Sequence, residues 1–223
     1  MLPGSDEVIR LARERLPQPE QMCGPFWIDV ALTAVTGRSA GLTSAALAAG
    51  TRIYPHDVDD WRPARQNPRT AEWAGLPVTD DPLESGTDAS GVYRALTEHV
   101  HVAAVSGPFT AGRVLDILES VCAAETPVVV IANIYTGLLT DPMDASIPWS
   151  MTAGHFCALT GMDRAESVVR VADSYPVGDP PGQHTQPAEA MAAALERRGH
   201  GAGGLLLVSA SPLGVDHTPW WFR

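Results

Sequence analysis

The sequence predicts an α+β fold, because helix-like segments dominate its first half and strand-like segments its second. Up to residue 124 the apolar residues mostly recur at helical spacing, with one short strand candidate among them. After residue 126 strand candidates follow one another, with a single late helix. This segregation is typical of α+β proteins, whereas regular alternation would predict a parallel sheet. With 223 residues, 45% of them hydrophobic, the chain suits one domain with a sizeable core.

Six segments carry the apolar spacing or the end signals of helices. Gly37 and Gly50 each follow one of them, and glycine readily adopts the left-handed conformation that ends a helix. Thr110 is placed to cap another, because its hydroxyl can accept a backbone N–H of the first turn. The predicted helices cover residues 5–15, 24–36, 41–49, 88–99, 110–124 and 187–198.

The predicted strands centre on the run 127–135, which is almost wholly apolar and of strand length, as expected for a buried strand. Residues 155–162 and 168–173 lie on either side of a short turn and predict an antiparallel pair. Shorter strands are predicted at 101–105 and 204–210. The sheet should therefore be mainly antiparallel.

Residues 51–90 are rich in Pro, Asp, Arg and Trp and show weak periodicity. We predict a loop-rich insertion there, within a single domain that spans residues 1–223. So long a loop in a compact domain is usually functional. Trp61 and Trp73 indicate that it packs against another part of the molecule.

The charge and the composition exclude several classes of protein. A net charge of −11 disfavours nucleic acid and anionic membranes as partners, because both are bound through basic patches. No apolar run approaches the roughly 18 residues of a membrane helix, and the start of the chain lacks the apolar region of a signal peptide. We therefore expect a cytoplasmic protein. All 15 basic residues are arginines, so no lysine Schiff base or lysine general base is available.

Cys23 is the residue that points most directly to chemistry. It follows a Pro- and Gln-rich turn and precedes the predicted helix 24–36. Backbone N–H groups and the helix dipole favour a thiolate at such a position. Cys23 is one of three cysteines, and no paired Cys spacing is present, so neither a disulfide framework nor a structural zinc site is expected.

A base and a group that orients it are predicted from the two strands of the hairpin. His155 follows Gly154 at the start of one strand, and Asp173 lies at the end of the other. In an antiparallel pair these two positions meet at one edge of the sheet. A cysteine nucleophile needs such a base, a group to orient it, and donors for the oxyanion. The Cys23 N–H and the side-chain amide of Gln18 or Gln21 are candidates for these donors.

These motifs, in this order, resemble the peptidase C39-like branch of the papain-like cysteine peptidase superfamily. The resemblance rests on Gln18 before Cys23-Gly24-Pro25, on the Gly-His pair that opens an apolar strand ending in Gly, and on the Asp after the next strand. It implies a papain-like α+β fold, with the nucleophile helix packed on a mainly antiparallel sheet. It also implies that Cys23 is the nucleophile, His155 the base and acid, Asp173 the orienting residue and Gln18 the oxyanion donor.

Two features depart from the family pattern. The family's glutamine usually lies slightly further upstream of the cysteine, so Gln18 and Gln21 both remain candidates, and Gln18 is preferred because Gln21 has little room to fold back. The peptidases of this branch are commonly fused to a transporter, and this sequence shows no membrane segment. That transport-linked role is not inherited.

The predicted function is acyl transfer through a Cys23 thioester, by a peptidase, an amidase or an amide-forming transferase. Hydrolysis and transfer to an amine share the first half-reaction, so the sequence leaves both open. A dedicated small intracellular substrate, such as a peptide or a carrier-bound acyl group in a bacterial biosynthetic pathway, is expected. No cofactor is expected. The alternatives are a non-catalytic binding protein of the same fold and a metal site formed by Cys23, His155 and Cys157.

Other notable residues are interpreted structurally. Cys157 and Cys122 are predicted to be core residues, because a free cysteine packs as a small hydrophobic side chain. His184, His200 and His217 fall in Gly- and Pro-rich segments and are predicted to be solvated. The aromatic residues at 220–222 are expected to anchor the C-terminal segment against the core.

Overall fold

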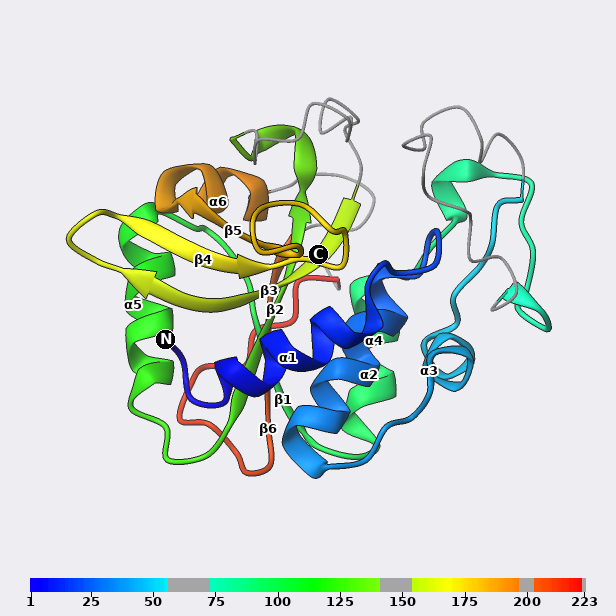
Figure 1. The fold of residues 1–223 in the computed structure, drawn as a ribbon, viewed down its shortest axis with the longest axis horizontal. Helices are drawn as coiled ribbons and strands as arrows, with labels where there is room; N and C mark the ends of the chain where they lie inside the picture. Colours follow the sequence, from blue (N-terminus) through cyan, green and yellow to red (C-terminus); the bar gives the residue numbers. More distant parts are fainter. Residues whose placement is uncertain (56–72, 141–153, 197–202, 222–223) are drawn as a thin grey trace.

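The computed structural model describes residues 1–55, 73–140, 154–196 and 203–221. Its described residues form a six-stranded antiparallel sheet with helices on both faces (Figure 1). The strand order is β1-β6-β2-β3-β4-β5. The strands are β1 (His101–Val105), β2 (Val128–Tyr135), β3 (Gly154–Asp163), β4 (Val168–Ala172), β5 (Gln183–Pro187) and β6 (Gly204–Ser209). The predicted α+β class is confirmed.

The helices divide between the two faces of the sheet (Figure 1). Three helices pack on one face, α1 (Ser5–Arg15), α2 (Cys23–Thr36) and α4 (Ala89–Thr97), and α3 (Leu42–Ala49) packs on α2 and α4. Two pack on the other: α5 (Ala111–Cys122) and α6 (Ala188–Leu195). Short 3₁₀ turns lie at η2 (Pro82–Glu84) and η3 (Thr136–Leu138).

Strand β2 lies near the centre of the sheet, and its side chains contribute to both hydrophobic cores. Val129 and Ile131 face the core under α1–α4, whereas Val130 and Ala132 face the core under α5 and α6. This period of two is the pleat of a strand buried on both sides. It explains why the apolar run 127–135 shows no alternation in sequence.

The predicted helices and all five predicted strands are confirmed to within a few residues at their ends. Thr110 caps α5 by accepting a hydrogen bond from the Arg113 N–H, and Gly37 ends α2 in the left-handed conformation. One strand, β5, was not predicted. Part of the predicted insertion, residues 56–72 with Trp61, lies outside the described residues, while Trp73 donates a hydrogen bond from Nε1 to the Glu20 carbonyl.

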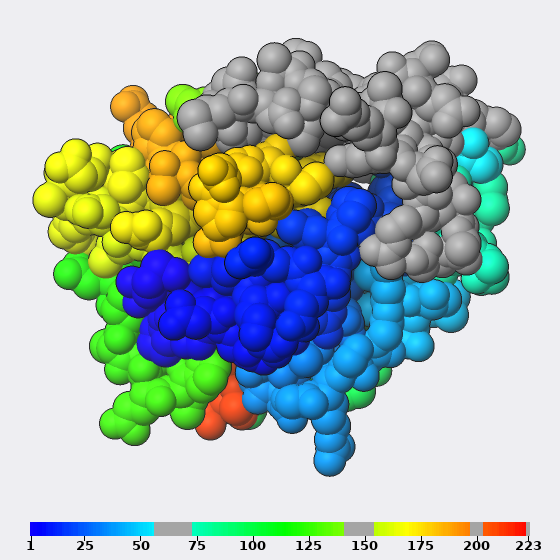
Figure 2. Space-filling view, in the orientation of Figure 1, coloured from blue at the N-terminus to red at the C-terminus, as the bar shows by residue number. Residues whose placement is uncertain are grey.

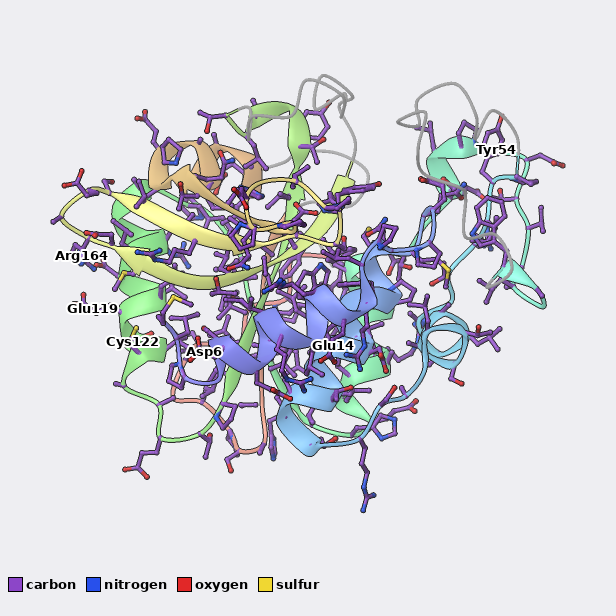
Figure 3. The ribbon with its side chains drawn as sticks, viewed as in Figure 1. Asp6, Glu14, Tyr54, Glu119, Cys122 and Arg164 are labelled. Carbon is purple, nitrogen blue, oxygen red and sulfur yellow. The ribbon has the colours of Figure 1, made fainter. Side chains whose placement is uncertain are left out.

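The prediction that Cys122 is a core residue is wrong. Cys122 is the last residue of α5 and is exposed, while Val114, Leu118 and Val121 supply the buried face of that helix. Because α5 ends at Cys122, no further helical turn follows to cover its side chain. Figure 3 shows Cys122 on the outer side of α5, near Glu119 and Arg164.

The N-terminal segment fastens α1 along the sheet. The Leu2 N–H and the Ser5 hydroxyl both donate to the Thr160 carbonyl of β3, at 2.9 and 2.6 Å. At the other end of α1, Arg15 donates to Asp29 of α2 at 2.8 Å. In Figure 2 the first helix crosses the visible face of the molecule beside the hairpin of β4 and β5. None of the helices in the described ranges is long and apolar enough to cross a membrane.

Candidate active site

Helix α2 presents Cys23 at its first position. The preceding turn is closed by a hydrogen bond from the Met22 N–H to the Pro19 carbonyl, at 3.2 Å, and Met22 itself is fully buried. No side chain caps this end of α2, so its first N–H groups are available to a ligand atom. Cys23 is partly exposed, whereas residues 24–32, which follow it in the helix, are buried. The thiol is therefore both anchored and accessible.

A hydrogen bond from Trp27 sets the position of α2 on β3. The indole Nε1 donates to the Phe156 carbonyl at 2.8 Å, and Trp27 is fully buried. Trp27 lies one helical turn after Cys23, and Phe156 directly follows His155. The bond therefore fixes the start of the helix relative to the start of the strand, where Cys23 and His155 lie.

Gly24 allows a close approach to the chain that leads into α4. A Cβ atom at this position would lie 2.8 Å from the Cβ of Thr87, closer than real contacts of this kind. Thr87 is itself held by a hydrogen bond between its hydroxyl and that of Thr51, at 2.7 Å. The glycine after the cysteine is thus required by packing.

His155 and Asp173 meet at one edge of the sheet. Strands β3 and β4 are antiparallel, with Ala158 opposite Ala172, so the residue after Ala172 lies near the start of β3. The His155 Nε2 atom is 3.0 Å from Asp173 Oδ1, and both side chains are buried. A carboxylate only accepts, so Nε2 carries the proton and Nδ1 is the ring nitrogen that remains for Cys23, which lies close enough to help raise the pKa of His155.

The electrostatics of the pair follow from burial and mutual attraction. Burial alone would lower the pKa of His155, but the attraction and hydrogen bond of Asp173 outweigh it and, with Cys23, raise that pKa to about 10. Burial would likewise raise the pKa of Asp173, but His155 and His184 hold that pKa well below its usual range. The two residues therefore form a buried charged pair when His155 is protonated.

Tyr175 completes the surroundings of His155. Its ring stacks on the imidazole with centroids 5.1 Å apart, and its backbone N–H donates to Asp173 Oδ1 at 2.9 Å. Burial, followed by the nearby charges of Glu20 and Cys23, raises the pKa of the Tyr175 phenol. The phenol therefore stays neutral, and the ring covers one side of the imidazole.

The two candidate glutamines occupy different environments. The Gln21 side chain is taken up by the Tyr54 backbone: Nε2 donates to the Tyr54 carbonyl and Oε1 accepts from the Tyr54 N–H, both at 2.7 Å. Tyr54 lies on the side of the molecule away from α5 (Figure 3). Gln18 is buried, and its backbone N–H donates to the Ser174 carbonyl at 3.0 Å.

The Gln18 amide is held by Ser174, the residue after Asp173. The Ser174 hydroxyl donates to Gln18 Oε1, and this leaves the Nε2 donor without an acceptor among the described residues. Gln18 therefore lies beside the His155–Asp173 pair with a donor to offer, whereas both polar atoms of the Gln21 amide are engaged elsewhere.

His184 is a residue of this site that sequence reasoning missed. The prediction that His184 is solvated is wrong: its side chain is only 4% exposed and lies on β5, with Nε2 3.6 Å from Asp173 Oδ2. The strand Gln183–Pro187 has no hydrophobic residue to reveal it. The only signal in the sequence was that His184 and Gln186 are two residues apart, and so face the same side of a strand.

Cys157 lies under the site, as predicted, and is fully buried. Burial raises the pKa of its thiol well above the ordinary value.

The described residues contain no group of three His, Cys, Asp or Glu side chains placed to hold a metal ion. His155 directs Nε2 to Asp173, which leaves one ring nitrogen for the space shared with Cys23.

The fold and this geometry define an α+β protein with a Cys-His-Asp site at the edge of an antiparallel sheet. The chain belongs to a protein family of unknown function (DUF6885), whose model matches residues 2–213. A comparison with curated proteins gives no match.

Proposed function

We propose that this protein is a cysteine-dependent acyl-transfer enzyme of papain-like type, which works through a thioester on Cys23. The observation that carries the proposal is the buried hydrogen bond between His155 and Asp173, beside a partly exposed Cys23 that acts electrostatically on His155. The three residues come from a helix start and two neighbouring strands, so the rigid scaffold holds them together. The resemblance to C39-like peptidases led to the same residues.

The first half-reaction forms the thioester. His155 Nδ1 takes the proton of the Cys23 thiol, and the sulfur attacks the carbonyl carbon of an amide. The oxyanion that forms accepts hydrogen bonds from the Cys23 N–H and from Gln18 Nε2. His155 then gives its proton to the leaving nitrogen as the carbon–nitrogen bond breaks. Asp173 keeps the imidazole in the required tautomer and stabilises its positive charge.

The second half-reaction returns the enzyme to its starting state. His155 removes a proton from water or from an amine, which attacks the thioester carbonyl, and the Cys23 sulfur leaves and is reprotonated. Water gives a peptidase or amidase, and an amine gives an amide-forming transferase. The fully buried aspartate and the stacked Tyr175 limit water around the imidazole, which suits either outcome. We propose a peptide, an amide or a carrier-bound acyl group as the substrate.

The test is the reactivity of Cys23 towards iodoacetamide as a function of pH. At a pH of about 5 an ordinary thiol is almost wholly protonated and reacts slowly. We expect alkylation of Cys23 at this pH and its loss in the His155→Ala variant. Because Cys122 is exposed and Cys157 buried, a Cys122→Ser background with peptide-level mass mapping separates the three thiols.

Two outcomes would reject the enzyme proposal. If Cys23 reacts only where an ordinary thiol does, or if His155→Ala leaves its pH profile unchanged, the thiol has no base. The alternative of a non-catalytic binding protein would then be favoured. The Cys157 thiol serves as an internal control, because a buried cysteine should remain unlabelled in the folded protein at every pH.

A further inference from the structure

The Asp173 carboxylate faces two histidines, of which the proposed mechanism uses one. Its Oδ1 atom accepts from His155 Nε2 and from the Tyr175 N–H, at 3.0 and 2.9 Å. Its Oδ2 atom receives no standard hydrogen bond within the described part of the chain, and the group that faces it is His184 Nε2, at 3.6 Å. The Asp173 side chain is fully buried, and that of His184 is 4% exposed.

The Gln186 side-chain amide, whose own orientation is set by Thr140, determines which ring nitrogen of His184 carries the proton. The Thr140 N–H can only donate, and it donates to Gln186 Oε1 at 2.9 Å, as does the Thr140 hydroxyl at 2.7 Å. The other end of the amide is therefore the NH₂ group. Gln186 Nε2 donates to the Thr140 carbonyl at 3.0 Å and to His184 Nδ1 at 3.1 Å.

Because Gln186 Nε2 is a donor, His184 Nδ1 must accept. A neutral imidazole then carries its proton on the other nitrogen, Nε2, which is the atom that faces Asp173. Gln186 is fully buried, so no water competes for its amide. The chain of hydrogen bonds from Thr140 through Gln186 thus determines that His184 offers an N–H, rather than a lone pair, to the carboxylate.

We propose that His184 is a positioning residue for the catalytic pair: a neutral Nε2–H donor that holds the free oxygen of Asp173 and takes a share of its negative charge away from His155. This inference rests on the proposed function, in which His155 must both accept and release a proton. An imidazole paired with an unshared buried carboxylate binds its proton tightly and releases it poorly. A second hydrogen-bond donor on the carboxylate weakens the binding of the proton by the imidazole.

The sign of the effect follows from the charge on Asp173. A donor stabilises the carboxylate more when His155 is neutral than when His155 is positively charged and already neutralises it. The His184 N–H therefore lowers the pKa of His155, and its removal raises that pKa. The other titratable groups that face this site in the described residues are Cys23, Cys157 and Tyr175, with Glu20 beside Tyr175.

The test is an NMR titration of the His155 ring in the full chain carrying Cys23→Ala, which removes the coupled thiol. With His184→Leu we expect the His155 midpoint to rise by about half a pH unit, a fraction of what a full hydrogen bond to a charged group would give. His184→Gln keeps an N–H near the Nε2 position, and we expect the midpoint to return to that of the parent. An unchanged midpoint in His184→Leu would overturn the inference, as would a shift that His184→Gln fails to reverse.

A second measurement covers the case in which His184→Leu does not fold. The nitrogen chemical shifts of His184 in the unsubstituted protein report which ring nitrogen carries the proton. We expect protonation at Nε2 and not at Nδ1, and Gln186→Met should release this restriction. Protonation at Nδ1 in the unsubstituted protein would overturn the inference.

These experiments separate the two proposals. The titration and the tautomer are measured without any reaction at Cys23, so they can fail while the alkylation of Cys23 still supports an enzyme. An unreactive Cys23 with a normal tautomer at His184 would instead remove the proposed function, and with it the role assigned to His184.

Discussion

Replacing Asp173 by Asn is the sharpest perturbation of this site, because it removes a charge and little else. The Asn carbonyl can still accept from His155 Nε2 and from the Tyr175 N–H, which both lie on Oδ1. The new NH₂ group, however, would face the His184 N–H, so two donors would meet. We therefore expect a folded but somewhat less stable protein.

The size of the expected effect follows from the pKa shift of His155. A rise of its pKa from 6.5 to about 10 corresponds to about 5 kcal/mol, and Asp173 is the main group that raises it. Without the carboxylate, burial, which is the largest influence, is opposed only by Cys23, so we expect the pKa of His155 to fall by more than three units, to below its ordinary value of 6.5. At a pH of about 7 the imidazole of this variant is mostly neutral and cannot stabilise a Cys23 thiolate, so alkylation at this pH should drop at least tenfold.

The assay is the rate of iodoacetamide alkylation of Cys23 between about pH 4 and pH 9, with the His155 ring titrated by NMR in parallel. Asp116→Asn is a matched control, because it makes the same chemical change on the exposed surface of α5, where Asp116 contacts Arg164. The reasoning is refuted if Asp173→Asn and Asp116→Asn give the same alkylation profile, or if the His155 midpoint stays where it is in the parent protein.

Three further predictions concern stability. The pKa of His155 is raised from an unfolded value of 6.5 to about 10 in the folded protein. The stability that the charged pair contributes should therefore be complete below pH 6.5 and lost as the pH rises towards about 10. Urea unfolding should show this dependence on pH, and Asp173→Asn should flatten it. Trp27→Phe removes the hydrogen bond to the Phe156 carbonyl and leaves a buried acceptor, which should lower the free energy of unfolding by about 1–3 kcal/mol, with a matching loss of Cys23 alkylation. Gly24→Ala brings a methyl group against Thr87 and should cost about 1–3 kcal/mol in urea unfolding, whereas an alanine at the exposed Glu98, which follows α4, should change little.

Local sequence signals predicted most of the fold, because they act within a few residues. The cap at Thr110 and the left-handed Gly37 are such signals, and both lie where the helix ends were expected. Strand β5 gave no signal, since Gln-His-Thr-Gln-Pro has no apolar alternation and gains its place by pairing with β4. A strand stabilised by backbone pairing and buried polar contacts cannot be recognised from hydrophobic pattern alone.

The site was predictable to the extent that order along the chain determines position. The antiparallel pair β3 and β4 brings His155 to Asp173 once the hairpin is assumed. The choice between Gln18 and Gln21 could not be made in this way, because it depends on which partner each amide finds. Tyr54, more than thirty residues away in sequence, engages Gln21, and Ser174 engages Gln18.

The polar groups behind Cys23 form a directed series, and that direction has a chemical consequence. Thr140 orients Gln186, Gln186 orients His184, and His184 offers an N–H to Asp173. Asp173 in turn accepts from His155 Nε2, so the basic nitrogen Nδ1 is left for the thiol. Buried polar groups stabilise a fold less well than apolar residues of the same size, unless all their partners are in place. Donors thus converge on Asp173 from His184 on one side and from His155 on the other. This arrangement is better explained by the need to hold His155, the proposed base, in one protonation state than by the stability of these strand ends.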